Sequence, residues 1–197
     1  MNPQPLLNYL NDIDRMSPAL EDRLLGALEF TKRVKKDFFL REGETNTHIY
    51  FLLTGLVRIY HLTPKDKEVT SWLLTEGNIF ISVHSFFLQQ PSFENIVAVE
   101  DCEAVGVSFR ALNDICRTHP EFNKHQVAIL RRYYAHSEDR KFKLMRQEHV
   151  QRYETLLNEE PELLQRATAP IIASYLNFSE SSLKRARSDY MNGKGLK

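Results

Sequence analysis

Cysteine is scarce in this 197-residue sequence: Cys102 and Cys116 are the only two, and they do not form a Cys-x-x-Cys pair. The sequence therefore predicts no disulfide framework, no cysteine-based zinc site and no four-thiolate iron–sulfur site. No apolar run approaches the roughly 18 residues that a membrane span needs. The N-terminus lacks the basic start and long apolar stretch of a signal peptide. We expect a cytoplasmic protein with no membrane partner.

The sequence also lacks the motifs of the common enzyme classes. It contains no Gly-x-Ser-x-Gly, no P-loop, no His-Glu-x-x-His and no Cys–His pair in a recognisable context. Possible haem ligands are present at His48, His61, His84 and Cys102, but no local pattern selects a pair of them. We therefore predict that the protein is not an enzyme and that it holds no metal and no cofactor.

Neither sign of charge is in excess, since Lys and Arg number 26 and Asp and Glu number 26. The charges are nevertheless unevenly placed: residues 140–197 hold 11 basic and 7 acidic side chains. A basic C-terminal part on an acidic body is typical of a polyanion-binding tail. The imbalance is modest, so chance is the alternative explanation.

Residues 34–108 have the pattern of short strands. Runs such as HIYFLLT, LVRIYHL, EVTSWLLT, IFISVHSFF and CEAVGVS are rich in β-branched and aromatic residues and recur at intervals of about ten residues. Such spacing indicates a sandwich or barrel. Gly43, Gly55 and Gly77 are expected where the backbone needs a positive φ or a close approach. Residues 1–30 have the spacing of short helices.

Residues 121–149 contain no Gly and no Pro, which predicts a helix of about 40 Å at 1.5 Å per residue. A helix of this length on a small domain needs a surface to pack against. We predict that it pairs with a second copy through Phe122, Ile129 and Tyr133. The alternative is a single helix packed on its own sheet.

Short helices are predicted over 150–168, broken at Pro161, and then a helix pair follows. Pro170 starts the first helix, Asn177 takes the left-handed turn, and Ser179 caps the second helix. Two short helices joined by a tight turn, the second one basic, are typical of a helix-turn-helix motif. An ordinary helical hairpin with a solvated basic face is the alternative.

Four segments together resemble the CRP/FNR family of bacterial transcription regulators, and within it the short branch common in Bacteroidetes-type bacteria. They are LREGETNTHIYFLLTGLVRIY (40–60), LLTEGNIF (73–80), LNDICRTHPEF (112–122) and IIASYLNFSESSLKRAR (171–187). The resemblance implies an α+β fold, whose N-terminal part is a double-stranded β-helix, a jelly-roll-like β-roll. It implies a β-roll sensor domain over 1–120, a dimerisation helix over 121–147 and a helix-turn-helix DNA-binding domain over 148–197.

The resemblance also implies which residues meet DNA. It places Glu180, Ser181, Lys184 and Arg185 in the major groove, where Arg and Lys reach base acceptors. Hydroxyls in the same helix start are candidates for phosphate contacts, and the candidates are Ser179, Ser181 and Ser182. Arg187 lies on another face, where it contacts phosphate or solvent. The best-known members have an acidic residue in place of Ser181, so its loss changes the sequence that is read.

Cyclic-nucleotide-binding members carry a Phe-Gly-Glu run and a later Arg run around the ligand. In this chain Phe80 matches, but Ser82 replaces the Glu, and Ser92, Phe93 and Glu94 replace the Arg run. The cation for a cyclic phosphate is missing, so the sequence argues against cyclic AMP and cyclic GMP. The candidate effector residues are Phe80, Ser82, His84, Ser85, Ser92 and Glu94.

Two interpretations of these polar residues remain. They bind an unidentified neutral or cationic small molecule, or, as we favour, they form a solvated loop over a filled or vestigial pocket. For the whole chain the leading interpretation is a homodimeric, sequence-specific DNA-binding transcription regulator. The alternative is a β-roll module that binds a small molecule or a protein and whose degenerate C-terminal helices do not bind DNA.

Overall fold

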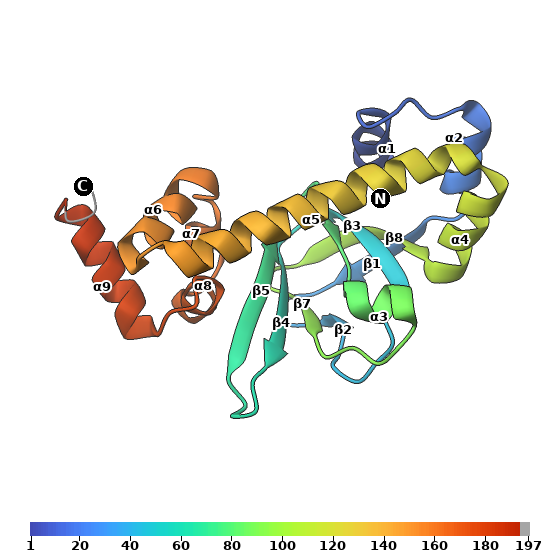
Figure 1. Ribbon diagram of the computed structural model, residues 1–197. Coiled ribbons are helices and arrows are strands. Elements are labelled where there is room, and N and C mark those ends of the chain that lie inside the picture. The colour runs from blue at the N-terminus through green and yellow to red at the C-terminus, as the bar shows by residue number, and fades with distance from the viewer. Residues whose placement is uncertain (194–197) are drawn as a thin grey trace.

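The chain folds into an N-terminal β-roll, a long helix that runs beside it, and a group of short C-terminal helices (Figure 1). The computed structural model describes residues 1–193. Residues 194–197, at the end of the predicted C-terminal domain, lie outside the described residues. No helix within residues 1–193 combines the length and the apolar character that crossing a membrane requires.

The β-roll consists of two four-stranded antiparallel sheets, with strand orders β1-β8-β3-β6 and β2-β7-β4-β5. Apolar side chains from both sheets, among them Leu52, Phe80 and Ile96, form a common core. At Gly55 φ is 99°, and a Cβ there would lie 2.5 Å from the carbonyl oxygen of Asp101. The strands are β1 (Glu29–Arg33), β2 (Phe38–Leu40), β3 (His48–Thr54), β4 (Val57–Leu62), β5 (Glu68–Leu74), β6 (Ile79–Phe80), β7 (Asn95–Ala98) and β8 (Cys102–Ser108).

Two elements of the roll differ from the sequence prediction. The strands begin at β1, before residue 34, because β1 pairs with β8 along its whole length although none of its residues is buried. Residues 83–88 form a helix, α3 (Val83–Leu88), where the sequence predicts a strand. This helix is too short to show a helical period, and it is anchored by Ser85, whose hydroxyl donates to the Gln90 carbonyl at 2.5 Å and accepts from the Asn46 amide at 2.8 Å.

Three helices enclose a second apolar core against the roll: α1 (Gln4–Asn11), α2 (Pro18–Leu25) and α4 (Phe109–Thr118). Ser17 and Ser108 cap α2 and α4 by accepting hydrogen bonds from backbone amides one turn on. A 3₁₀ turn at Pro120–Phe122 then leads into the long helix.

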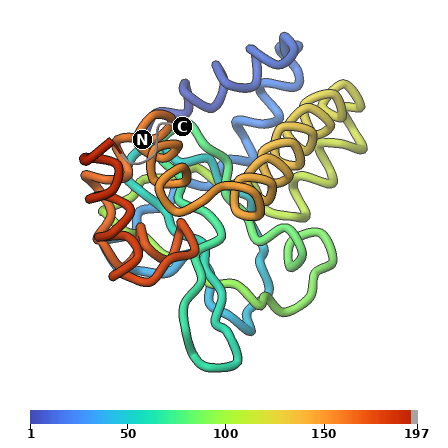
Figure 2. The backbone as a smooth tube through the Cα atoms, turned by 60° about the vertical axis from the view of Figure 1, so that its left-hand side comes forward, coloured from blue at the N-terminus to red at the C-terminus, as the bar shows by residue number. Residues whose placement is uncertain are grey.

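The long helix, α5 (Asn123–Arg146), lies with one side against the roll and α1 (Figures 1 and 2). Phe122, at its start, is only 4% exposed inside the core around α1, and Ile129 packs on the same core. Tyr133 stacks on Trp72 of β5 at 5.2 Å between ring centroids. Phe122 is therefore buried in its own chain, which contradicts its place in the predicted seam. Ile129 and Tyr133 contact the roll on this side, and their place in a seam between two copies stays a prediction.

The outer side of α5 carries a different apolar row. Val127, Leu130 and Tyr134 recur at intervals of three and four residues and are 45%, 43% and 67% exposed. Leu130 also lines the space between α5 and the roll, so this row adjoins the side of the helix that packs on the roll.

The C-terminal helices build their core partly on the roll. They are α6 (His149–Glu159), α7 (Leu163–Arg166), α8 (Ala169–Tyr175) and α9 (Glu180–Met191). Leu156, Leu163 and Ile172 are buried in one cluster with roll residues Leu56 and Leu73. Burial of these side chains removes apolar surface from water, which favours the docked arrangement.

The turn between α8 and α9 has the predicted features. Asn177 adopts a left-handed conformation with φ of 57°, and the Phe178 amide donates to the Ala173 carbonyl at 2.7 Å. The Ser179 hydroxyl accepts from the Ser182 amide at 3.1 Å and so caps α9. Both sequence predictions are confirmed.

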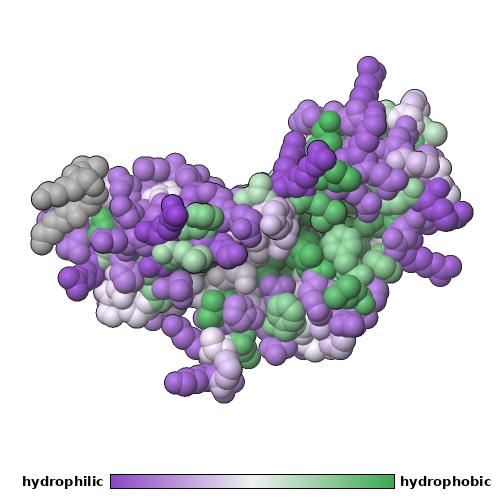
Figure 3. All heavy atoms as spheres, viewed as in Figure 1, coloured by the Kyte–Doolittle hydropathy of each residue, from purple (hydrophilic) through white to green (hydrophobic). Residues whose placement is uncertain are grey.

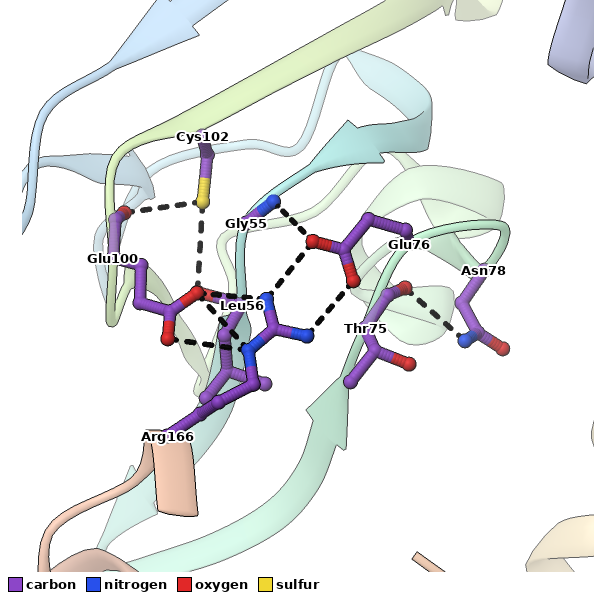
Figure 4. A network of polar contacts seen from close by, with 8 residues as sticks. All are labelled: Gly55, Leu56, Thr75, Glu76, Asn78, Glu100, Cys102 and Arg166. Carbon is purple, nitrogen blue, oxygen red and sulfur yellow. Dashed lines mark hydrogen bonds and ion pairs between the residues drawn. The ribbon is translucent and has the colours of Figure 1, made fainter. Parts of the chain in front are cut away.

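An ion network ties α7 to two turns of the roll (Figure 4). The Arg166 guanidinium donates to both oxygens of Glu76 at 2.9 Å and to the Glu100 carboxylate at 2.7 and 3.2 Å. Glu76 also accepts from the Gly55 amide at 2.7 Å. Paired hydrogen bonds of this geometry are the stronger form of ion pair. The network therefore holds the C-terminal helices against the roll.

We predict that Arg166→Met loosens this attachment, because Met keeps an apolar stem but leaves Glu76 and Glu100 facing each other without a cation. Amide hydrogen exchange in α7 and α8 should become faster, while exchange in β3 and β8 stays unchanged. Arg117→Met, which removes an exposed pair with Asp114, is the control and should have little effect. Equal exchange in α7 of both variants would contradict the role of the network.

The effect of Arg166→Met should depend on pH. Hydrogen bonds from Arg166 lower the pKa of the Glu76 carboxyl below its ordinary value of 4.5. A carboxyl with a lowered pKa stabilises the folded state above its unfolded pKa, and that contribution is lost as the pH falls through the folded pKa. The difference in melting temperature between wild type and variant should shrink as the pH drops below 4.5. A difference that stays constant in thermal melts over that range would contradict the prediction.

Candidate functional site

Two of the predicted basic residues, Lys184 and Arg185, lie on one exposed face of α9, which is at the end of the molecule (Figure 1). Ser181, Lys184, Arg185 and Ser188 are exposed and lie at the spacing that places them on one side of a helix. The opposite side holds the buried Leu183 and Ala186 in the core shared with α6. The fold therefore presents this face to solvent on a helix whose back is fixed.

The start of α9 is a cluster of hydroxyls. The Ser179 Oγ lies 2.9 Å from the Ser181 Oγ and 2.8 Å from the Ser182 Oγ, besides accepting from the Ser182 amide. Glu180 is exposed beside them. The positive end of the helix dipole lies at this N-terminus, which favours a negatively charged group there. Ser179 is thus a cap, and phosphate contacts from these serines stay a prediction.

The basic side chains of α9 point in different directions. Arg185 has a side chain 86% exposed, and its Nε lies 3.6 Å from the carboxylate of Asp189 one turn on. Such an exposed pair contributes little energy, so the guanidinium can exchange partners. Arg187 lies about 160° around the helix axis from Arg185, from the geometry of 3.6 residues per turn. The two arginines therefore cannot enter one groove together.

The region predicted as the effector pocket is filled by its own side chains. Ser82, Ser85 and Ser92 are buried, and the Ser82 and Ser92 hydroxyls lie 3.1 Å apart. Ser82 donates to Glu94 at 2.9 Å, and its amide donates to Asn46 at 2.7 Å. The interpretation as a solvated loop is wrong for these serines, because their hydroxyls are satisfied inside the protein.

The other three candidates are Glu94, which belongs to this network, Phe80 and His84. Burial raises the pKa of the Glu94 carboxyl, and the hydrogen bond from Ser82 opposes that rise. Phe80 is buried in the core of the roll, where it stacks on Tyr50 at 5.2 Å. His84 is exposed and contacts Phe93 at 5.2 Å between ring centroids. The six candidates therefore form a core position, a buried hydroxyl–carboxylate network and an exposed ring, not one open site.

A cavity of about 360 Å³ lies between α5 and the roll, and of the six candidates Phe80 is among the residues that line it. Its walls include Tyr50, Trp72, Ile129, Tyr133 and His136. Sequence reasoning missed this cavity because its lining includes residues of α1, five strands and α5, which are far apart in the sequence. In the sequence, the one indication of this cavity was the wide apolar stripe at the start of α5. Within residues 1–193, no group of three or more His, Cys, Asp or Glu side chains is placed to hold a metal ion.

Comparison with known proteins identifies the β-roll. Residues 32–119 match the family model of the cyclic nucleotide-binding domain. No match is found among curated protein sequences. This part of the chain, which spans most of the β-roll, is thus similar to cyclic nucleotide-binding domains, although its cassette residues form the network described above.

Solved structures share the arrangement beyond this domain. FixK2 from Bradyrhizobium japonicum superposes with a TM-score of 0.72 at 19% identity, covering 85% of this chain and 86% of that one. The regulator CLP from Xanthomonas campestris, described as responsive to c-di-GMP, gives 0.71 at 17% identity, covering 91% and 94%. A CRP/FNR family regulator from Eubacterium rectale gives 0.73 at 16% identity, covering 94% and 89%. These structures are of transcription regulators rather than enzymes, and the resemblance to the CRP/FNR family is confirmed at the level of the fold.

We predict that cyclic AMP does not bind to the cassette region. A phosphate there would face Glu94 and no arginine at the matching positions, and a desolvated anion without a partner is costly. Calorimetric titration should give no heat beyond dilution. Glu94→Gln removes the repelling charge but supplies no cation, so it should not bind either; saturable binding by wild type would contradict the prediction.

Proposed function

We propose that this chain is a CRP/FNR-type transcription regulator that binds DNA as a homodimer through α9. In this proposal residues 1–120 form the sensor, 121–147 the dimerisation helix and 148–197 the DNA-binding domain. The observation that carries it is the exposed face of Ser181, Lys184 and Arg185 on a helix whose opposite side is packed on α6. The shared fold with known regulators supports the same conclusion.

The chemistry of α9 favours DNA over a protein partner. Arg185 has the planar fork that matches the two acceptors on guanine in the major groove, and Lys184 reaches base acceptors or phosphate. The capped N-terminus of α9 adds amides and hydroxyls suited to phosphate oxygens. Apolar anchors typical of protein interfaces do not occur among Glu180, Ser181, Lys184 and Arg185.

The dimer interface we propose is the outer row of α5. Val127, Leu130 and Tyr134 leave apolar surface in water, and two such rows can pack against each other across a two-fold axis. The inner row, with Ile129 and Tyr133, already contacts the roll. The outer row therefore replaces the inner row as the proposed seam.

We predict that Val127→Asp splits the dimer, because a carboxylate would lose its hydration in the apolar seam. Asp near the start of α5 is compatible with the helix dipole, so the monomer should still fold. Light scattering at micromolar concentration measures the change. Met191→Asp, an exposed apolar residue on α9, is the control and should remain a dimer. A monomeric wild type would contradict the proposed assembly.

We predict that Arg185→Ala costs roughly 1–3 kcal/mol of DNA binding and relaxes the preference at one base pair of each half-site. Arg187→Ala should weaken binding to all sequences evenly and reduce the salt slope by about one unit. Arg117→Ala on α4 is the control and should leave both quantities unchanged. Selection from random DNA, followed by binding at several salt concentrations, measures the three variants.

The same assay separates the alternative function. If wild type, Arg185→Ala and Arg187→Ala all bind random DNA equally weakly, the proposal is wrong. The chain would then be a β-roll interaction module whose C-terminal helices do not bind DNA.

A further inference from the structure

One of the basic residues on α9 has a carboxylate beside it. In the view of Figure 3, the surface of the C-terminal helices is mostly hydrophilic, whereas hydrophobic side chains gather beside the N-terminal half of α5. Lys184, Arg185 and Arg187 of α9 are all exposed. Residues four apart are neighbours on a helix surface, and Asp189 stands at this spacing from Arg185. The residues at the same spacing from the other two are uncharged, so Arg185 differs from them in its neighbour.

The two partners of this pair differ in how firmly they are held. The Arg185 Nε lies 3.6 Å from the Asp189 carboxylate. The side chain of Arg185 is 86% exposed, whereas that of Asp189 is 26% exposed. A covered side chain has less room to move than one that projects into water. The carboxylate is therefore the fixed partner, and the guanidinium is the mobile one.

Helix stability does not account for an acidic residue at position 189. Asp189 lies in the last turn of α9, which ends at Met191, and the negative end of the helix dipole disfavours a carboxylate there. The order of the pair, with the acid after the base, is also the less favourable one in a helix. The phosphates of bound DNA would repel the carboxylate as well. Its effect on Arg185 explains this carboxylate better than any gain in helix stability.

The edge of the guanidinium that faces Asp189 decides which edge is left for a base. Arginine presents one edge with Nε and a terminal nitrogen, and another edge with its two terminal nitrogens. Asp189 is paired with Nε, so the edge with the two terminal nitrogens remains for O6 and N7 of guanine. The N-terminal part of a recognition helix reaches the base edges, and Asp189 lies one turn further from that end than Arg185. The carboxylate therefore stands behind the guanidinium.

We propose that Asp189 is a positioning residue for Arg185, which it orients so that the two terminal nitrogens face a guanine in the major groove. Asp189 thereby sharpens the base preference of α9. It also lowers the affinity for DNA of any sequence, because its own charge repels phosphate. The guanine contact rests on the proposed function, whereas the pairing of the two side chains in the free protein does not.

A DNA-binding experiment compares Asp189→Asn with wild type, both as the full chain. The DNAs are the site that wild type selects from random sequences, the same site with one guanine replaced, and random DNA. The guanine is the one whose preference Arg185→Ala relaxes. In Asp189→Asn this preference should fall about fivefold or more, because a loosely held arginine loses part of its paired contact. Affinity for random DNA should instead rise about twofold to fivefold, because a negative charge near phosphate is removed.

Two further variants serve as controls in this experiment. Asp189→Glu keeps the charge and should keep most of the preference for guanine. Glu162 is an exposed acidic residue just before α7, outside α9. Glu162→Gln changes the net charge by the same amount as Asp189→Asn and should bind both kinds of DNA like wild type.

A measurement without DNA tests the pairing itself. In the full chain with isotope-labelled arginine, nuclear magnetic resonance follows hydrogen exchange of each arginine Nε–H, and Arg185→Lys assigns the Arg185 signal by its loss. This exchange should be about twofold to fivefold faster in Asp189→Asn, the factor that corresponds to an exposed ion pair. Exchange of the Arg187 Nε–H should stay the same, because the residue four positions later is uncharged.

The possible outcomes separate this role from the proposed function. Asp189 does not position Arg185 if the Arg185 Nε–H exchanges equally in wild type and Asp189→Asn, or if that variant keeps the full preference for guanine. A variant that loses affinity for selected and random DNA alike would indicate only a role in the stability of α9, which also contradicts the proposal. If wild type selects no site, the proposed function fails and the guanine contact fails with it. If wild type selects a site and Asp189→Asn selects it equally well, only the role of Asp189 is wrong.

Discussion

One guanidinium between two carboxylates fixes how the C-terminal helices sit on the β-roll. Glu76 and Glu100 come from different turns of the roll and would repel each other without Arg166 between them. Arg166 of α7 pairs with both carboxylates. Leu56 and Leu73 of the roll add apolar contacts with the C-terminal helices. The position of α8 and α9 follows from this docking, since they continue directly from α7.

The long helix α5 connects three surfaces with different chemistry. Its inner side packs on the roll and borders the apolar cavity, and its outer side carries exposed apolar residues. Near its C-terminal end Arg140 contacts Tyr175 of α8 by stacking and by a hydrogen bond. One continuous helix thus joins the roll, the exposed apolar row and the C-terminal helices.

Helix caps and turn conformations were predicted correctly from the residues next to them. The burial of whole strands and helix faces was predicted less well. Asn177, Ser179 and the positive φ of Gly43, Gly55 and Gly77 follow from backbone sterics and capping, which act within a few residues. The sequence analysis did not predict β1, because an edge strand with no buried residue has no apolar pattern. Phe122 was predicted in a seam between two copies but lies in the core of its own chain, because periodicity gives the width of an apolar stripe but not which neighbour covers it.

The same limit explains why the fold of the β-roll was easier to predict than the contacts of its polar residues. A β-roll depends on alternating apolar residues and turns, which survive when the cation for a phosphate is replaced by Ser92 and Glu94. Without that cation, the buried Glu94 carboxylate needs hydrogen-bond donors. Ser82 supplies one at 2.9 Å, so the residues at these positions bond to one another. The fold of the roll is therefore kept although the groups that would hold a cyclic phosphate are replaced, because the core of the roll depends on apolar residues such as Leu52 and Ile96 and not on that charge.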